Sequence, residues 1–290
     1  MHSLLLAARP KTLPAAIAPV CAGCALAWKF SGVFSLWLAA CTLLSTIAIQ
    51  IATNFFNDAI DFSKGADTSA RLGPVRITSS GRMSRRAVLI SGGLMVLAAA
   101  LLALPLISTR GWPILAIGIP GIYFAYGYTG GPLPLAYRGL GDFFVLLFFG
   151  LIAVSGTVFV QTGTWPWFGL ACGLQIGMLS TVLIAINNLR DLHEDTQSSK
   201  RTLAVRWGAT FARCEITALC LLPHLVGVLV WPQLEFPSGF WLPLPTIALG
   251  VLLALCVWKT EPSCRYNQFL AAAALQLLLF TALFVTACLN

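Results

Sequence analysis

Two short segments of the chain combine amide and carboxylate side chains at the same spacing. In the first, Asn57 is followed four positions later by Asp61, and in the second Asn187 is followed four positions later by Asp191. Residues four apart share one face of a helix, so each pair can point in a single direction. Because the second pair lies 130 positions after the first, the spacing predicts a duplicated unit in which each half contributes one polar helix end.

Four aspartates in these segments favour the binding of a divalent cation beside a phosphate group. They are Asp58, Asp61, Asp191 and Asp195. Carboxylates that lie close together near a membrane repel one another, so they need a compensating cation. Mg²⁺ takes oxygen ligands and commonly joins a few carboxylates to substrate phosphates, whereas metals that prefer thiolate or histidine fit this set poorly. We therefore predict that the four aspartates bind Mg²⁺.

Basic and amide side chains in the same segments are expected to hold the outer oxygens of a diphosphate, because guanidinium and ammonium groups form charge-assisted hydrogen bonds with phosphate. The residues assigned to this role are Asn57, Lys64, Arg71, Arg76, Asn187, Lys200 and Arg201. A site that binds an anionic head group at the membrane surface, above an apolar cavity, predicts a polyprenyl diphosphate or a phospholipid as substrate.

The elements that must position these segments are transmembrane helices. Of the 290 residues, 58% are hydrophobic and 10% are charged, whereas about a quarter are charged in a soluble domain. The apolar residues fall into blocks that are each long enough to cross a bilayer as a helix. The blocks lie at about 13–29, 34–53, 87–108, 112–128, 140–160, 165–186, 214–232, 239–258 and 268–289. The sequence therefore predicts an all-α, polytopic bundle of about nine transmembrane helices around a cavity.

Basic residues are divided unequally between the two sides of this bundle. If the helices alternate in direction, sixteen Lys and Arg residues lie on the side of the two long loops, 54–86 and 187–213, and only Lys29 and Arg110 lie on the other. Since the richer side is cytoplasmic, we expect a multi-pass protein of the inner (plasma) membrane with a cytoplasmic N-terminus and an external C-terminus. The net charge of +8 then reflects topology, so the bilayer is an expected partner and nucleic acid is not.

These residues resemble the motifs of a known family of membrane enzymes. The two aspartate-rich runs, Asn57-Asp58-x2-Asp61 and Asn187-x2-Arg190-Asp191-x3-Asp195, resemble those of the UbiA-type intramembrane prenyltransferases. Three further runs are similar to the 1,4-dihydroxy-2-naphthoate polyprenyltransferases of menaquinone synthesis, at residues 67–76, 128–142 and 200–206. The resemblance extends from about residue 10 to 213. It implies a UbiA-like fold, and with the 130-residue offset we expect one domain over 1–290 with pseudo-repeated halves at about 10–130 and 140–258.

The resemblance also implies an activity. A polyprenyl chain would pass from polyprenyl diphosphate to 1,4-dihydroxy-2-naphthoate in a Mg²⁺-dependent reaction, with loss of CO2, to give a demethylmenaquinol. Arg138 and Tyr126 are candidates to bind the aromatic acceptor. The superfamily motif carries its last aspartate four positions after Asp61, where this chain has Gly65. The nearest candidate is Asp67, which we assign as a metal ligand or a base.

Three alternatives stay open at this point. A prenyltransferase of the same superfamily would act on another aromatic acceptor, homogentisate or 4-hydroxybenzoate. A cation-coupled transporter would use paired Asp and Asn at a pseudo-symmetric site, although carboxylates at helix ends beside basic loops suit a phosphate better than a cation at the midplane. A CDP-alcohol phosphotransferase clusters its aspartates in one stretch, whereas here they are split by 130 positions.

Overall fold

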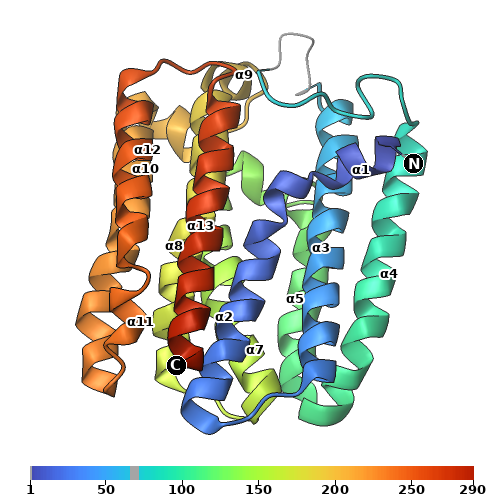
Figure 1. The fold of residues 1–290 in the computed structure, drawn as a ribbon. Coiled ribbons are helices and arrows are strands. Elements are labelled where there is room, and N and C mark those ends of the chain that lie inside the picture. Colours follow the sequence, from blue (N-terminus) through green and yellow to red (C-terminus); the bar gives the residue numbers. More distant parts are fainter. Residues whose placement is uncertain (1, 66–71) are drawn as a thin grey trace.

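The computed structural model describes residues 2–65 and 72–290, and within these ranges it contains helices and no strands. Figure 1 shows the long helices standing side by side as a bundle. Eight segments of the described chain are long and apolar enough to cross a membrane. They are α2 (Pro14–Ser31), α3 (Leu36–Ser63), α4 (Arg85–Arg110), the unit Gly141–Thr162, α8 (Trp167–Arg190), the unit Leu203–Leu234, the unit Ser238–Lys259 and α13 (Tyr266–Leu289).

The ninth predicted span is a shorter apolar helix, α5 (Trp112–Gly127), of 16 residues. It runs along the bundle and packs against α3 and α4 (Figure 1). The all-α fold is therefore confirmed, with eight full-length candidate spans and one short helix. Three of the spans are composite. The span Gly141–Thr162 consists of α6 (Gly141–Val145), the π-helix η3 (Leu146–Ile152) and α7 (Ala153–Thr162), and the span Leu203–Leu234 consists of α10 (Leu203–Val230) and η4 (Trp231–Leu234). The span Ser238–Lys259 contains α11 (Ser238–Trp241), η5 (Leu244–Thr246) and α12 (Ile247–Lys259).

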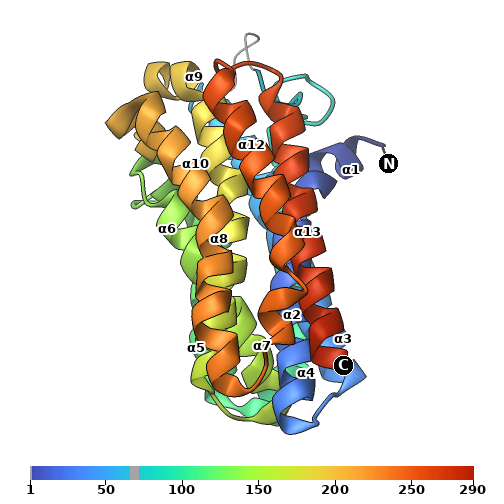
Figure 2. The same cartoon turned by 60° about the vertical axis from the view of Figure 1, so that its left-hand side comes forward.

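Helices α3 and α8 finish at the same end of the bundle, which we call the carboxylate end. The short elements α1 (His2–Ala8), η1 (Pro10–Thr12) and α9 (Leu192–Gln197) also lie there. Figures 1 and 2 place the N-terminus near this end and the C-terminus near the opposite one. That separation agrees with an odd number of crossings.

The predicted long loop 187–213 is largely helical, and the predicted loop 54–86 begins as the last turns of α3, which corrects both loop assignments. Residues 54–63 continue α3, and α10 begins at Leu203, with a non-helical residue at Gly208 (φ 86°). Hydropathy marks only the apolar part of a helix, but these helices extend further because their polar residues face a cavity and not lipid. The chemistry-bearing segments are therefore held on rigid helix ends.

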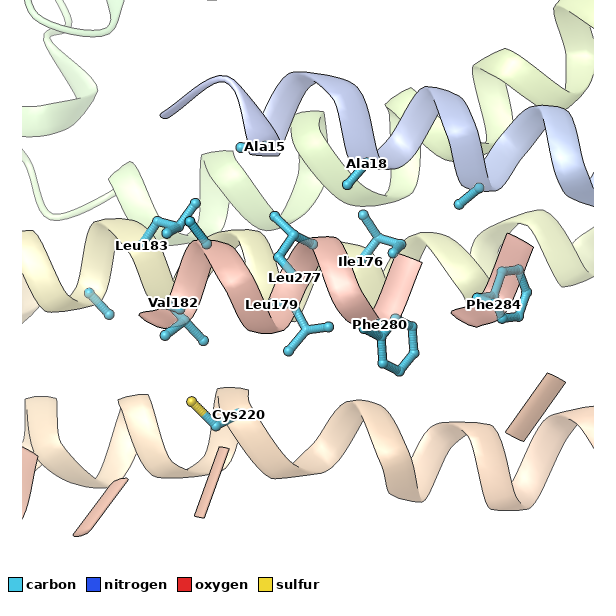
Figure 3. Close-up of a cluster of buried hydrophobic side chains, with 14 of the residues drawn as sticks. Ala15, Ala18, Ile176, Leu179, Val182, Leu183, Cys220, Leu277, Phe280 and Phe284 are labelled. Carbon is cyan, nitrogen blue, oxygen red and sulfur yellow. The ribbon is translucent and has the colours of Figure 1, made fainter. Parts of the chain in front are cut away.

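Helix α8 lies at the centre of the main hydrophobic core. Figure 3 shows Ile176, Leu179 and Val182 of α8 beside Leu277 and Phe280 of α13. On another side α8 approaches η3 so closely that a Cβ added at Gly150 would lie 2.4 Å from the carbonyl oxygen of Gly173. Small residues at such contacts let membrane helices touch along their backbones. This packing fixes the height and rotation of α8, and with them the position of its polar end.

The outer surface of the bundle is apolar and carries exposed tryptophans near its ends. Helix α4 presents a stripe of exposed side chains at helical spacing, namely Ile90, Leu94, Leu97, Leu101 and Leu104. Exposed tryptophans at the end opposite the carboxylates are Trp28, Trp37, Trp112, Trp165, Trp167 and Trp241. Tryptophan favours the interface between lipid and water. These features are those of an integral membrane protein.

Candidate active site

A cavity of about 640 Å³ runs into the bundle from the carboxylate end. Helix α3 lines it from Thr42 to Asp61, a rise of about 28 Å at 1.5 Å per residue. The carboxylate end of the cavity is polar, and the lining becomes more apolar further in, with Leu106, Ile114 and Val160. Gly118 and Gly121 of α5 also line it, and a Cβ added at either would meet nothing within 4 Å. The cavity can therefore accommodate an elongated molecule with a polar head.

Asp61, in the last turn of α3, is 4% exposed and faces this cavity. Tyr137 donates its hydroxyl to Asp61 Oδ1 at 3.0 Å, and Arg76 donates Nη2 to Oδ2 at 3.2 Å. Both partners come from segments far along the chain. The first aspartate of the pseudo-repeat is thus positioned by tertiary contacts.

Asp58, one turn earlier on α3, has a different environment. Its two carboxylate oxygens accept hydrogen bonds from the backbone N–H groups of Ile77 (3.0 Å) and Thr78 (2.9 Å). The carboxylate therefore ties the segment after Arg76 to α3. Although Asp58 also lines the cavity, any metal would have to share its oxygens with these backbone donors.

Asp191 lies where α8 ends, and its immediate neighbour holds it. Arg190 donates Nε to Asp191 Oδ1 at 2.7 Å and Nη2 to Oδ2 at 2.8 Å. This bidentate geometry is the strong form of an arginine–carboxylate pair. The motif includes Arg190, but the sequence assigns it no role; the structure brings it into the cavity lining beside Asp191.

Asp195 is buried in α9, and Lys200 lies 3.5 Å from its Oδ1. Burial, together with the charges of Asp191 and Asp61 and against the opposing effect of Lys200, raises the pKa of this carboxyl to about 6. Asp195 Oδ2 is buried and has no hydrogen-bond partner in the described part of the chain. The charges of Asp61, Asp191 and Asp195 therefore act on one another, although Asp195 itself does not line the cavity.

The two motif asparagines line the cavity and are half-buried. Asn57 accepts a hydrogen bond from the Thr129 hydroxyl, and Asn187 donates to the Leu183 carbonyl at 3.0 Å. Near them Lys64 donates to the carbonyl of Thr129 at 2.7 Å. Partial burial lowers the pKa of Lys64, although the nearby Asp61 charge opposes this change. Lys64 therefore lies at the rim of the site.

Five predicted residues do not reach the cavity lining in the described structure. Asp195 and Lys64 contact residues of the lining, Lys200 and Thr129 respectively. The other three are Arg201, Arg138 and Tyr126. The Arg201 and Arg138 side chains are exposed, and Arg138 contacts the Pro132 carbonyl at 3.4 Å. Tyr126 is 45% exposed and packs edge-to-face on Phe56. The structure therefore does not bring these three side chains together with the aspartates.

Two further predicted residues, Asp67 and Arg71, lie outside the described residues.

A polar group formed by α3 and the segment before α2 was not predicted from the sequence. Arg9 and Lys11 line the cavity, and Thr12 accepts hydrogen bonds from Asn54 Nδ2 (3.0 Å) and Gln50 Nε2 (3.3 Å). Gln50 Oε1 is buried and lacks a hydrogen-bond partner among the described residues. The signal lay in the spacing, because Gln50 and Asn54 share the face of α3 that carries Asp61.

The donor set fits Mg²⁺ better than a metal held by protein alone. Among the described residues, no three His, Cys, Asp or Glu side chains form a group that could hold a metal ion. The carboxylates and amides nevertheless offer only oxygen ligands, and Asp195 Oδ2 is without a partner. Mg²⁺ is commonly bound through one or two carboxylates, with water and substrate phosphates completing its coordination. The residues present fit that arrangement.

Comparison with known proteins identifies the family of this chain. A family model described as the UbiA prenyltransferase family matches residues 16–280. The 1,4-dihydroxy-2-naphthoate octaprenyltransferase of Haemophilus influenzae is 35% identical over 291 positions, covering 96% of this chain and 92% of that protein. The protein of the same name from Mycobacterium leprae is 41% identical over 226 positions, covering 77% of this chain and 75% of its own.

Solved structures support the same fold. A UbiA homologue from Aeropyrum pernix K1 has a TM-score of 0.73 at 13% identity, covering 95% of this chain and 97% of that one. A homologue from Archaeoglobus fulgidus, solved with DMAPP and Mg²⁺ bound, has a TM-score of 0.66 at 14% identity, covering 97% and 99%. From the family match, the relatives and the fold together, this chain belongs to the UbiA prenyltransferase family.

Proposed function

We propose that this protein transfers a polyprenyl chain from polyprenyl diphosphate to 1,4-dihydroxy-2-naphthoate, with decarboxylation, to give a demethylmenaquinol. The observation that carries the proposal is a single cavity with opposed aspartates and basic groups at one end and a more apolar interior. A diphosphate head and a prenyl tail match these two parts. The relatives named octaprenyltransferases support the same substrates.

At the carboxylate end, Asp61, Asp191 and Asp195 would hold Mg²⁺, with Asp58 as a further predicted ligand. When bound, Mg²⁺ would supply positive charge that stabilises the leaving diphosphate. The side chains proposed to bind the phosphate oxygens are Asn57, Lys64, Arg76, Asn187 and Lys200. Because Arg76 and Lys200 already pair with Asp61 and Asp195, they lie where a diphosphate bound to these aspartates would arrive.

The allylic cation that forms as the C–O bond breaks must be kept from water. Phe144, Phe148 and Tyr128 line the cavity next to the polar end. Aromatic faces attract a nearby cation by about 0.5–2 kcal/mol each. We infer that these rings protect and stabilise the cation until the acceptor ring attacks it.

The aromatic acceptor requires a polar subsite close to this cation. The sequence predicts Arg138 and Tyr126 for that role, but their side chains lie away from the cavity lining described above. Arg9, Lys11 and Gln50 line the cavity instead. We propose that this wall binds the acceptor, with a basic side chain on the carboxylate and the unpartnered Gln50 oxygen accepting from a ring hydroxyl.

The proposed orientation puts the carboxylate end in the cytoplasm and the C-terminus outside the inner (plasma) membrane. Sixteen of the eighteen basic residues favour it. A reporter fused after Asn290 should behave as external, and a cytoplasmic reporter would contradict this topology.

The activity can be tested with protein reconstituted in nanodiscs. Labelled prenyl diphosphate and Mg²⁺ would be supplied with 1,4-dihydroxy-2-naphthoate, homogentisate or 4-hydroxybenzoate in parallel. We expect transfer of the prenyl label to the naphthoate and, in a parallel assay with naphthoate labelled at its carboxyl carbon, release of that label as CO2. Both should be lost in excess EDTA. Preference for another acceptor would reassign the substrate within the family, and activity that persists in EDTA would contradict the role of Mg²⁺.

A further inference from the structure

Asn267, the second residue of α13, contacts both halves of the carboxylate end. Its Oδ1 accepts a hydrogen bond from Arg190 Nη1 at 2.7 Å. Its Nδ2 donates to the backbone carbonyl of Leu72 at 2.9 Å. A neutral amide is suited to this position because it offers an acceptor and a donor at once. Asn267 lies 77 positions after Arg190, beyond every motif in the sequence.

The Arg190 side of this contact leads directly to a predicted metal ligand. Arg190 is 2% exposed and binds both oxygens of Asp191. Since the guanidinium is planar, a bond that fixes one of its nitrogens also fixes the direction of the others. Asn267 therefore helps to set the orientation of the Asp191 carboxylate without touching it.

The Leu72 side leads to the other half of the site. The N–H of Leu72 donates to Glu194 Oε1 at 2.9 Å, so both backbone groups of Leu72 are held by residues far later in the chain, Glu194 and Asn267. From Leu72 the chain continues through Pro74 to Arg76, which line the cavity, and Arg76 pairs with Asp61. The segment 72–76 thus links the surroundings of Asp191 to Asp61.

We propose that Asn267 is a positioning residue that holds the two aspartate segments in register, through Arg190 to Asp191 and through Leu72 to Arg76. The inference rests on the proposed function, because it assumes that Asp191 binds a divalent cation. It goes beyond that function in assigning a role to α13, on which no metal ligand or substrate contact has been placed.

The size of the expected effect follows from how metal sites behave. Groups that orient a metal ligand typically contribute about 10- to 100-fold to metal affinity. We expect Asn267→Ala to weaken divalent-metal binding on that scale and to raise the KM for prenyl diphosphate. Asn267→Asp retains an acceptor for Arg190 but has no N–H for Leu72. It should leave metal affinity close to that of the unaltered protein while still raising the KM.

The experiment measures Mn²⁺ binding by electron paramagnetic resonance in nanodiscs, with no substrate present, and prenyl-transfer kinetics in parallel. Gln268→Ala is the matched control, because Gln268 is the next residue of the same helix and its side chain is exposed. The control should bind Mn²⁺ and turn over substrate as the unaltered protein does.

The outcomes separate this inference from the proposed function. Failure of the unaltered protein to bind Mn²⁺ would overturn the metal site of the proposed function. Normal Mn²⁺ binding by the unaltered protein and equally by Asn267→Ala would overturn only the role of Asn267. If Asn267→Ala does not fold, Asn267→Asp carries the test, and an unchanged KM for prenyl diphosphate in that variant would overturn the inference.

Discussion

Asp61 and Asp191 occupy the same place in two motifs 130 positions apart, yet they are held in different ways. Asp61 depends on Tyr137 and Arg76, which come from other parts of the chain, whereas Asp191 is bound by the residue that precedes it. The first site can form only when distant segments have packed together, but the second is partly built into its own helix turn. Equivalent spacing therefore does not imply an equivalent environment.

The halves also differ in the positions around these aspartates. With the same 130-residue offset, Asp58 corresponds to Asn188, and Gly65 corresponds to Asp195. Asn188 donates to the Asp142 carboxylate at 3.3 Å, while Asp58 accepts from a backbone segment. The second half thus contributes a distal carboxylate that the first lacks at this position.

The largest expected effect tests whether Asp61 and Asp191 remain equivalent in function. Asp→Asn at either position keeps the size but removes the charge, so each should lower the rate of prenyl transfer by at least about 100-fold, the scale of losing one electrostatic stabiliser. The double variant should be little worse than the poorer single, because groups that act as a unit are non-additive. Rates would be measured across a Mg²⁺ titration for all four proteins, and near-normal turnover by either single variant would refute the shared site.

Asp195, in the second motif, is expected to make metal binding depend on pH. Its carboxyl has a pKa of about 6, and since metal binds the anion, apparent Mg²⁺ affinity should fall by up to about tenfold per pH unit below 6. The raised pKa means that the folded state binds this proton more tightly than the unfolded state. Protonation of Asp195 therefore favours folding as the pH falls from about 6 towards the ordinary carboxyl pKa.

Metal titrations between pH 5 and 8 check this prediction, and thermal unfolding over the same range separates it from acid denaturation. Asp195→Asn should bind metal less tightly but with a flatter pH dependence. An unchanged slope in this variant would assign the titration to another group.

A third difference concerns the wall beneath each aspartate. Gln50 and Asn54 on α3 correspond to Ser180 and Ile184 on α8, so the first half has the more polar wall. We expect Gln50→Leu to raise the KM for the aromatic acceptor by about tenfold, the scale of one hydrogen bond to a charged or polar group. Arg138→Ala, at the exposed rim, should change it little. Steady-state kinetics with both substrates check the prediction. A larger effect on the acceptor KM at Arg138 than at Gln50 would place the acceptor-binding site next to Arg138.

The smallest effect on activity is expected at Asp58. Because both of its oxygens accept backbone hydrogen bonds, Asp58→Asn should lower stability by about 1.5–3 kcal/mol while reducing turnover far less than Asp61→Asn. Thermal unfolding and prenyl-transfer rates, measured together, distinguish these roles. A loss of activity as large as that of Asp61→Asn would identify Asp58 as a metal ligand.

The sequence predicted the helices well because lipid requires continuous apolar runs. Three of the four predicted aspartates, Asp58, Asp61 and Asp191, line one cavity, whereas Asp195 lies outside its lining. The sequence did not predict their partners. Tyr137 is 76 positions from Asp61, and no local pattern identifies such a contact.

The predictions for Arg138 and Tyr126 illustrate the same limit. Arg138 directly follows Tyr137 at the end of η2 (Leu135–Tyr137), where the tyrosine turns inward and the arginine outward. On α5, Phe124 lies on the cavity face and Tyr126 lies well round the helix from it. Which of several neighbouring side chains enters the cavity depends on the rotation of each element, and packing sets that rotation.

The bare backbone of α5 at Gly118 and Gly121 has a consequence for how such an enzyme can evolve. Because these glycines have no side chain and a Cβ would meet open space, one substitution there can narrow the cavity without moving a helix. The depth of the cavity can thus change independently of the side chains at the carboxylate end. A lineage could shorten the cavity by altering one glycine while every charged residue stays the same.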